Sequence, residues 1–201
     1  MVINLETTEI QESSCSRMDM LNGPVWNKII RYALPVAATG VLEQLFNASD
    51  IAIVGNFAGD VKTIAVAAIG ATSPIIGLLL YFFIGIALGS NVVIATAIGR
   101  KDEDTVHKAV HTSIIMSIAG GLLVTIFGEI FIGNLLHALN VPEDVLPYAL
   151  LYIRIYLLGM PAILLYNFEA AIFRSIGETK MPLKALAMSG VLNVLLNLFF
   201  V

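Results

Sequence analysis

The longest uncharged stretch of the sequence is Thr63–Gly99, TIAVAAIGATSPIIGLLLYFFIGIALGSNVVIATAIG. None of its 37 residues carries a charge, whereas a helix needs only about 20 apolar residues to cross the ~30 Å hydrocarbon core of a bilayer. As one straight helix the stretch would extend about 55 Å, so we expect it to cross a membrane and to tilt, protrude or break near Gly85–Asn91. The Gly85-x-x-x-Gly89 spacing also predicts a close approach of two helix backbones.

Composition excludes an ordinary water-soluble domain. The chain has 201 residues, of which 58% are hydrophobic and 13% charged, while a soluble domain carries about a quarter charged residues. The net charge is −4 without a basic run, so we expect no nucleic-acid partner. One cysteine, Cys15, excludes a disulfide framework. Because motifs such as H-E-x-x-H and G-x-S-x-G are absent, we expect no enzyme activity, no metal site and no cofactor.

The remaining apolar runs predict an all-α, polytopic transmembrane bundle. Residues 1–22 form a polar tail that we expect to be cytoplasmic, and we expect residues 23–201 to hold the transmembrane spans. The last apolar run meets the end of the chain without a charged flank, so we expect the chain to be a fragment of something longer. The predicted spans are residues 33–57, 64–97, 109–136, 145–173 and 183–201.

Basic residues predict the orientation of these spans. Nine of the eleven fall in the N-terminal segment or in the second and fourth connections, and only Lys62 lies in a connection on the other side, with Arg154 inside the fourth span. Positive residues favour the cytoplasmic side. We therefore expect a multi-pass protein of the cell (plasma) membrane, surrounded by lipid bilayer, with a cytoplasmic N-terminus.

Polar residues inside the spans are the candidate functional groups. An intramembrane carboxylate is costly, so it is a functional candidate by default. Glu43, Asn47 and Asp50 are spaced i, i+4, i+7 and share one helix face. Asn193 and Asn197 share a face of the fifth span, and a rise of 1.5 Å per residue places Asn197 at the depth of Asp50. The alternatives are an interfacial Asp50 and a merely structural hydrogen bond from the asparagines.

Other polar residues of the spans are expected near the membrane surfaces, and prolines are expected to bend the helices. Glu129 and Arg154 are expected near the outer surface, and Glu169 near the cytoplasmic end of the fourth span. Proline removes a helix hydrogen bond and bends the helix. Prolines that interrupt apolar spans therefore predict bent helices, a common feature of transporters; they are Pro35, Pro74 and Pro161.

Several motifs, in this order, resemble the multidrug and toxic compound extrusion (MATE) transporters. Leu34-Pro35, then Gln44, then Ser49–Gly55 are similar to the first helix of that family. The resemblance covers about Asn22 to Val201. Its further segments are Ile69–Thr72, Gly85–Gly89, Ala97–Asp102, Phe173–Pro182 (FRSIGETKMP) and Leu192–Asn197 (LNVLLN).

The resemblance implies a fold and a set of roles. The family has twelve helices in two six-helix lobes, of which this chain would supply the first five. The resemblance implies that Asp50 is the cation-coupling carboxylate and that Pro35 bends its helix. Asn193 matches the family's fifth-helix asparagine, and Asn197 stands where many prokaryotic relatives carry an aspartate. Glu43, Gln44 and Asn47 would line the cavity.

From the resemblance we expect a cation-coupled antiporter, driven by H⁺ or Na⁺, that exports organic cations, drugs or metabolites by alternating access. Its partners would be a small-molecule substrate and the missing C-terminal lobe. One alternative is a flippase of the same superfamily that moves a lipid-linked saccharide, although such proteins tend to carry a row of cationic cavity residues. A non-transporting membrane scaffold is the other alternative.

Overall fold

The computed structural model describes residues 25–200, and within that range the chain is helical apart from short turns. The prediction of an all-α fold is therefore confirmed. The predicted tail, residues 1–22, lies outside the described residues. The elements are α2 (Val25–Phe57), the 3-10 helix η1 (Gly59–Val61), α3 (Lys62–Gly99), α4 (Glu103–Ala138), α5 (Leu146–Ser175) and α6 (Lys180–Phe200).

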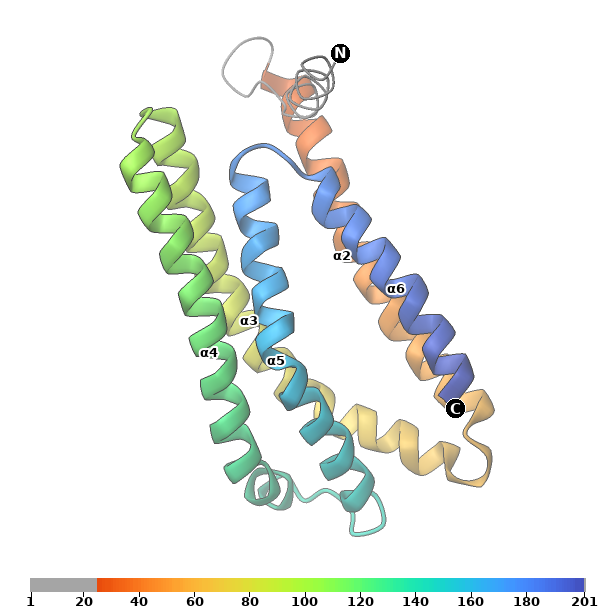
Figure 1. The fold of residues 1–201 in the computed structure, drawn as a ribbon. Coiled ribbons are helices and arrows are strands. Elements are labelled where there is room, and N and C mark those ends of the chain that lie inside the picture. Colours follow the sequence, from red (N-terminus) through yellow and green to blue (C-terminus); the bar gives the residue numbers. More distant parts are fainter. Residues whose placement is uncertain (1–24, 201) are drawn as a thin grey trace, which may run out of the picture.

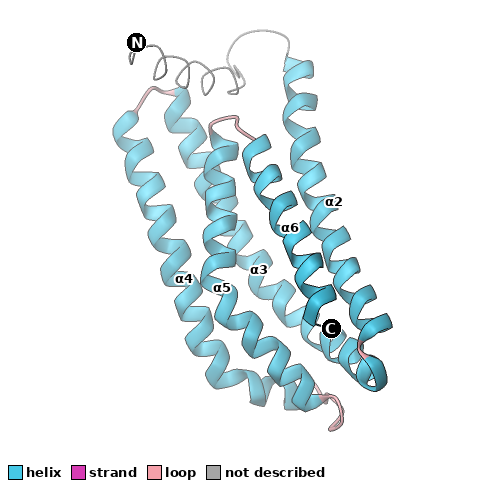
Figure 2. Ribbon diagram, turned by 45° about the vertical axis from the view of Figure 1, so that its right-hand side comes forward, coloured by secondary structure: helices cyan, strands magenta, loops and turns pink. Residues whose placement is uncertain are grey.

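The helices form two groups. Helices α3, α4 and α5 pack against one another, while α2 packs mainly on α6 and has fewer contacts with α3. Figures 1 and 2 show the α2–α6 pair running side by side, and Figure 1 shows it apart from the three-helix group for most of its length. The pair connects to the group through η1 at one end and through the α5–α6 turn at the other.

The core of the protein lies along one face of α5. Buried apolar residues recur there at helical spacing, so one stripe of α5 is enclosed by its neighbours. Figure 2 shows α5 between α4 and α6, with α3 behind it. The buried residues of this stripe are Ala149, Ile153, Leu157, Met160, Leu164 and Phe168.

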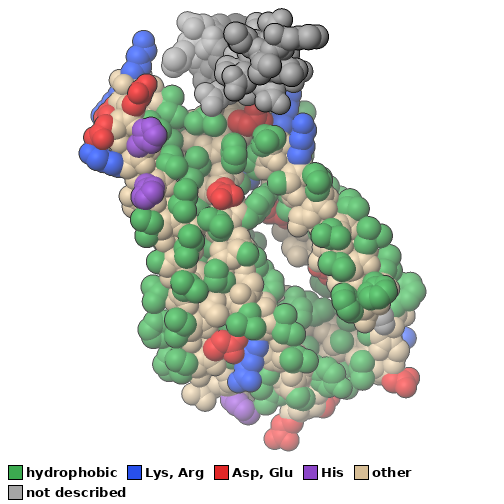
Figure 3. Space-filling model, viewed as in Figure 1, with side chains coloured by type: hydrophobic (Ala, Val, Ile, Leu, Met, Phe, Trp, Pro, Cys, Tyr) green, Lys and Arg blue, Asp and Glu red, His purple; other side chains and the backbone are tan. Residues whose placement is uncertain are grey.

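The outer surfaces of the helices are apolar, as a lipid environment requires. Large hydrophobic side chains are exposed along every helix, including Phe82 of α3, Ile130 of α4 and Leu158 of α5, and they cover much of the visible surface in Figure 3. Four helical stretches are long and apolar enough to cross a membrane. The protein is therefore a multi-pass membrane protein. The four stretches are Gly59–Gly99, Glu103–Ala138, Leu146–Ser175 and Lys180–Phe200.

Helix α2 is not among those four stretches, although the predicted span 33–57 lies wholly within it. Polar side chains interrupt its apolar sequence, most of them in its second half. Its crossing of the membrane remains a prediction. The interrupting residues are Glu43, Gln44, Asn47, Ser49, Asp50 and Asn56.

Within the described residues, neither the predicted break nor the predicted close helix contact occurs at Gly85–Asn91. Helix α3 is continuous from Lys62 to Gly99, and Figure 1 shows it changing direction in its first half, which contains Pro74. Among the described residues, no atom lies within 4 Å of a Cβ built on Gly85 or Gly89. The two glycines therefore face away from neighbouring helices. Asn91 instead joins α3 to α5, because its Nδ2 donates to the Ala171 carbonyl at 3.1 Å.

Side-chain caps fix where two of the helices begin. Asp102 precedes α4 and accepts hydrogen bonds from the Thr105 hydroxyl at 2.6 Å and backbone N–H at 3.0 Å. These bonds hold the pKa of Asp102 below its usual value. At the α5–α6 turn, Gly177 adopts φ +80°, and Glu178 accepts from the backbone N–H groups of Lys180 and Met181. Hydrogen bonds between residues at most three positions apart therefore define both turns.

Candidate functional site

Asp50 and Asn197 form the centre of the candidate site. The Asn197 amide Nδ2 donates to the Asp50 carboxylate Oδ1 at 2.6 Å, although 147 positions separate the two residues in sequence. The Asn197 Nδ2 also lies 3.4 Å from the side-chain oxygen Oδ1 of Asn193, one turn earlier. Asp50 and Asn197 are both half-buried, and Asn193 is exposed. The structure thus brings together the three residues that the sequence predicts as the coupling group.

A close helix contact holds these residues at hydrogen-bonding distance. The ring of Phe46, one turn before Asp50, occupies the space where a Cβ on Gly190 would lie. Gly190 is two turns before Asn197 and is buried. Because glycine has no side chain, α6 approaches the aromatic ring directly. Ile53, on the same face of α2, is also buried.

Glu43, Gln44 and Asn47 are positioned differently from Asp50. Glu43 is half-buried and close enough to Arg174, at the end of α5, to interact electrostatically. Gln44 and Asn47 are exposed. Among the described residues no side-chain hydrogen bond of theirs joins the Asp50 group. Their cavity-lining role stays a prediction.

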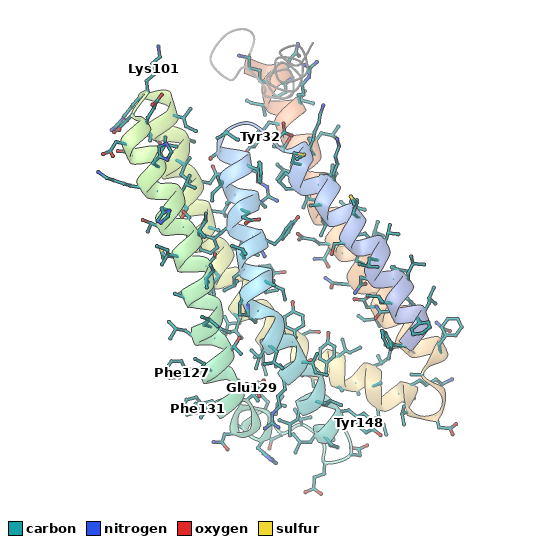
Figure 4. The ribbon with its side chains drawn as sticks, viewed as in Figure 1. Tyr32, Lys101, Phe127, Glu129, Phe131 and Tyr148 are labelled. Atoms are coloured by element: carbon teal, nitrogen blue, oxygen red, sulfur yellow. The ribbon has the colours of Figure 1, made fainter. Side chains whose placement is uncertain are left out.

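Pro35 lies inside the continuous helix α2, and its carbonyl accepts from the Thr39 hydroxyl at 2.9 Å. One turn earlier, the Tyr32 hydroxyl donates to the Arg174 carbonyl at 3.3 Å. On the other side of the α5–α6 turn, the Tyr166 hydroxyl donates to the Pro182 carbonyl at 3.1 Å. These two bonds join the α2–α6 pair to α5 at the end where Figure 4 labels Tyr32.

Beyond that end the two groups separate. Figure 3 shows a hollow between the α2–α6 pair and the three-helix group, with acidic side chains at its edge. In Figure 4 side chains from both groups extend toward this space.

Two tyrosines of α5 belong to the same region and were missed by the sequence analysis. Tyr152 lies within electrostatic range of Asp50, and Tyr156, one turn later, lies within electrostatic range of Glu43. The two rings are themselves neighbours, with centroids 6.4 Å apart. The i, i+4 spacing of the two tyrosines places them on one face of an apolar span, and this pattern could have indicated them from the sequence.

Glu129 and Arg154 were each predicted as interfacial, and the structure pairs them. Arg154 Nε lies 3.5 Å from Glu129 Oε2, joining α5 to α4. Figure 4 places Glu129 toward the end of the molecule opposite to Lys101. The pair places a carboxylate beside the cation of the fourth predicted span.

The chemistry available at the centre is that of one carboxylate and two amides. A carboxylate binds H⁺ or a cation, and an amide presents either an N–H donor or a carbonyl oxygen after rotation by 180°. Among residues 25–200, no three His, Cys, Asp or Glu side chains group as a metal site would require. The arrangement is suited to exchanging a proton or a monovalent cation.

The fold and these motifs have counterparts in known proteins. The MatE family model matches residues 35–199, which is most of the chain. The chain belongs to the MatE (MATE) family. The resemblance of the sequence to MATE transporters is thereby confirmed.

Individual MATE relatives agree with this assignment. The probable multidrug resistance protein YoeA of Bacillus subtilis is 30% identical over 172 residues, which cover 86% of this chain and 36% of that protein. A FAD transporter of Shewanella oneidensis is 24% identical over 182 residues, covering 90% and 39%. A multidrug resistance MATE family transporter solved in an outward-facing conformation superposes with a TM-score of 0.80 at 25% identity, covering 90% and 39%. The chain thus spans less than half the length of the MATE proteins it matches.

Proposed function

We propose that this chain supplies the first five helices of a two-lobe, cation-coupled MATE antiporter that exports small organic molecules. The observation that carries the proposal is the hydrogen bond between Asp50 and Asn197. A carboxylate in a mostly apolar helix is expensive, so its retention favours a role in the transport cycle. Because the chain covers 36% to 40% of its curated relatives, the activity belongs to the complete protein.

In the proposed mechanism, Asp50 exchanges between a charged and a cation-loaded form. The charged carboxylate favours the amide donor of Asn197 and therefore close packing of α2 on α6. Binding of H⁺ or Na⁺ removes or compensates the charge and weakens this preference. The loaded and unloaded forms would thus favour different packings of the α2–α6 pair, and Pro35 would serve as the flexible point of α2.

The substrate class is proposed broadly. The relatives include multidrug resistance proteins and a FAD transporter, so the proposed substrate class stays broad. We propose an organic cation or drug-like molecule as substrate, the plasma membrane as location and the cytoplasm as the side of the N-terminus. The flippase alternative is less favoured, because such proteins tend to carry a row of cationic cavity residues. The cation of the fourth span, Arg154, is paired with Glu129.

The test is gradient-driven transport by the complete protein in liposomes. H⁺ and Na⁺ gradients are imposed separately. A fluorescent organic cation should move against its own gradient when the gradient of the coupling ion, H⁺ or Na⁺, is imposed in the opposite direction. The isolated 201-residue chain serves as the comparison and should give no movement. Transport independent of both ion gradients, or transport of a lipid-linked saccharide alone, would contradict the proposal.

A further inference from the structure

Helix α5 changes direction midway, as Figure 1 shows, and Pro161 lies inside it. Proline has no backbone N–H, so the carbonyl four residues earlier loses its helical partner. For Pro161 that carbonyl belongs to Leu157, whose side chain is fully buried. An unpaired carbonyl in a membrane protein is costly unless another group donates to it.

The missing donor comes from the neighbouring helix. The Thr125 hydroxyl of α4 lies 2.6 Å from the Leu157 carbonyl and 3.0 Å from the Gly121 carbonyl of its own helix. A hydroxyl has one proton to donate, and the shorter distance assigns it to Leu157. The Gly121 carbonyl needs the proton less, because the backbone N–H of Thr125 pairs with it in a regular helix.

The backbones of the two helices meet at this point. A Cβ on Gly121 would overlap the backbone of Pro161, and a Cβ on Gly128 would lie 2.8 Å from the Leu157 side chain. Gly121, Thr125 and Gly128 are spaced i, i+4, i+7 and so form one face of α4. The bend of α5 therefore rests on a surface shaped to receive it.

The two other prolines in helix interiors, Pro35 of α2 and Pro74 of α3, lack this arrangement. Pro35 frees the Arg31 carbonyl and Pro74 frees the Gly70 carbonyl, by the same four-residue rule. Within residues 25–200, no side-chain hydrogen bond reaches either of these carbonyls. The carbonyl freed in α5 is thus bonded by a neighbouring helix, whereas within residues 25–200 no side chain donates to the carbonyls freed in α2 and α3.

The bend sets the direction of the half of α5 that lies before Pro161. This half carries Tyr152 and Tyr156, which lie within electrostatic range of Asp50 and Glu43. We propose that Thr125 is a positioning residue: it replaces the backbone hydrogen bond that Pro161 removes and so fixes where the tyrosine-bearing half of α5 lies opposite α2.

A double-mutant cycle on the complete protein tests the hydrogen bond. Thr125→Val keeps the shape and removes the donor, so it should lower the midpoint of thermal unfolding of the complete protein by about 1–2 °C. Thr125→Ser keeps the hydroxyl and should restore most of the loss. Pro161→Ala returns an N–H to Leu157, so in that background Thr125→Val should have little further effect. Additive effects of the two changes would overturn the proposal.

Thr72→Val is the matched control for this cycle. Thr72 is fully buried, and its hydroxyl bonds only carbonyls of its own helix, Ala68 and Ile69, which retain their backbone partners. Its replacement should leave the midpoint less changed than Thr125→Val does. An equal or larger loss for Thr72→Val would show that any buried hydroxyl matters equally, and it would overturn the specific role of Thr125.

Spin-label distances test the positioning. In a cysteine-free version of the complete protein, which includes Cys15→Ser, labels at the exposed Leu151 and Phe173 report the bend of α5. Labels at Leu151 and Ile51 report where the half of α5 before Pro161 lies relative to α2. Thr125→Val should broaden both distance distributions, and Thr125→Ser should leave both narrow. Unchanged distributions in Thr125→Val would overturn the proposal. Since neither readout uses transport, the result is independent of the proposed antiport.

Discussion

Asn197 of α6 donates a 2.6 Å hydrogen bond to the carboxylate of Asp50 on α2, and this bond joins the two helices that stand apart from the rest of the bundle. The contact lies on the face of α2 that also carries Phe46 and Ile53, so it is supported by close packing on the same side. A bond to an ionised group is stronger than one between neutral groups. The α2–α6 pair therefore contains a charge-sensitive contact.

Replacement of Asn197 should weaken transport without abolishing it. Asn197→Ala removes a hydrogen bond donor but leaves the exchangeable carboxylate, so the initial rate of gradient-driven export should fall about 3- to 10-fold. Asn193→Ala is the matched comparison, since that amide lies 3.4 Å from Asn197 and does not contact Asp50 directly. A larger loss for Asn193→Ala than for Asn197→Ala would reverse the assigned importance of the two amides.

Gly190 should tolerate a methyl group poorly. Gly190→Ala forces the Phe46 ring to turn or the helices to separate, and overpacking of this kind costs about 1–3 kcal/mol. Phe46→Leu in the same chain should recover part of the loss. Gly133→Ala in α4 is the control, because nothing lies within 4 Å of the added Cβ. Thermal unfolding in detergent measures all four proteins, and an unchanged midpoint for Gly190→Ala would contradict the packing argument.

Asp102 should stabilise α4 in a pH-dependent manner. The Thr105 hydroxyl and backbone N–H lower the pKa of Asp102 in the folded protein, so its contribution is fully present above the unfolded value of about 3.9. As pH falls through the lowered folded pKa, the contribution is lost. Asp102→Ala should therefore lower the unfolding midpoint at neutral pH, and its difference from wild type should shrink below pH ~3.9. A difference that does not change with pH would argue against the ionised cap.

Orientation in the membrane has a direct chemical test. Lys101 in the α3–α4 turn and Glu143 in the α4–α5 turn are both exposed and connect opposite ends of α4. In a cysteine-free version of the complete protein, which includes Cys15→Ser, Lys101→Cys should resist an impermeant thiol reagent applied to intact cells, while Glu143→Cys should react. Reaction at position 101 from outside would invert the proposed topology.

Depth along a membrane helix could be predicted from sequence because the rise per residue is constant. Counting from Arg31 and from Lys184 placed Asp50 and Asn197 at one level, and the structure brings them into contact. Rotation of each helix about its axis could not be predicted, because helices that are apolar on all sides give no amphipathic pattern. Gly85 and Gly121 illustrate the point, since only Gly121 faces a neighbouring helix.

The same limit explains the missed pairings. Glu129 and Arg154 lie on different helices, and their ion pair depends on how α4 and α5 are turned toward each other. Thr125 resembles any other membrane threonine until the carbonyl freed by Pro161 is found beside it. Such contacts are properties of helix pairs, which a single sequence does not specify.

In the proposed mechanism Asp50 couples transport to an ion gradient. The most direct test compares substrate exchange with gradient-driven accumulation in Asp50→Asn. The asparagine keeps the shape of the side chain but does not titrate. In liposomes that contain the complete protein, the variant should exchange labelled for unlabelled substrate within about 2-fold of wild type, because exchange requires no net ion movement. It should fail to accumulate substrate when an H⁺ or Na⁺ gradient is imposed, whereas Asp60→Asn, at the exposed η1 turn, should accumulate normally. Gradient-driven accumulation by Asp50→Asn at the wild-type rate would contradict the claim.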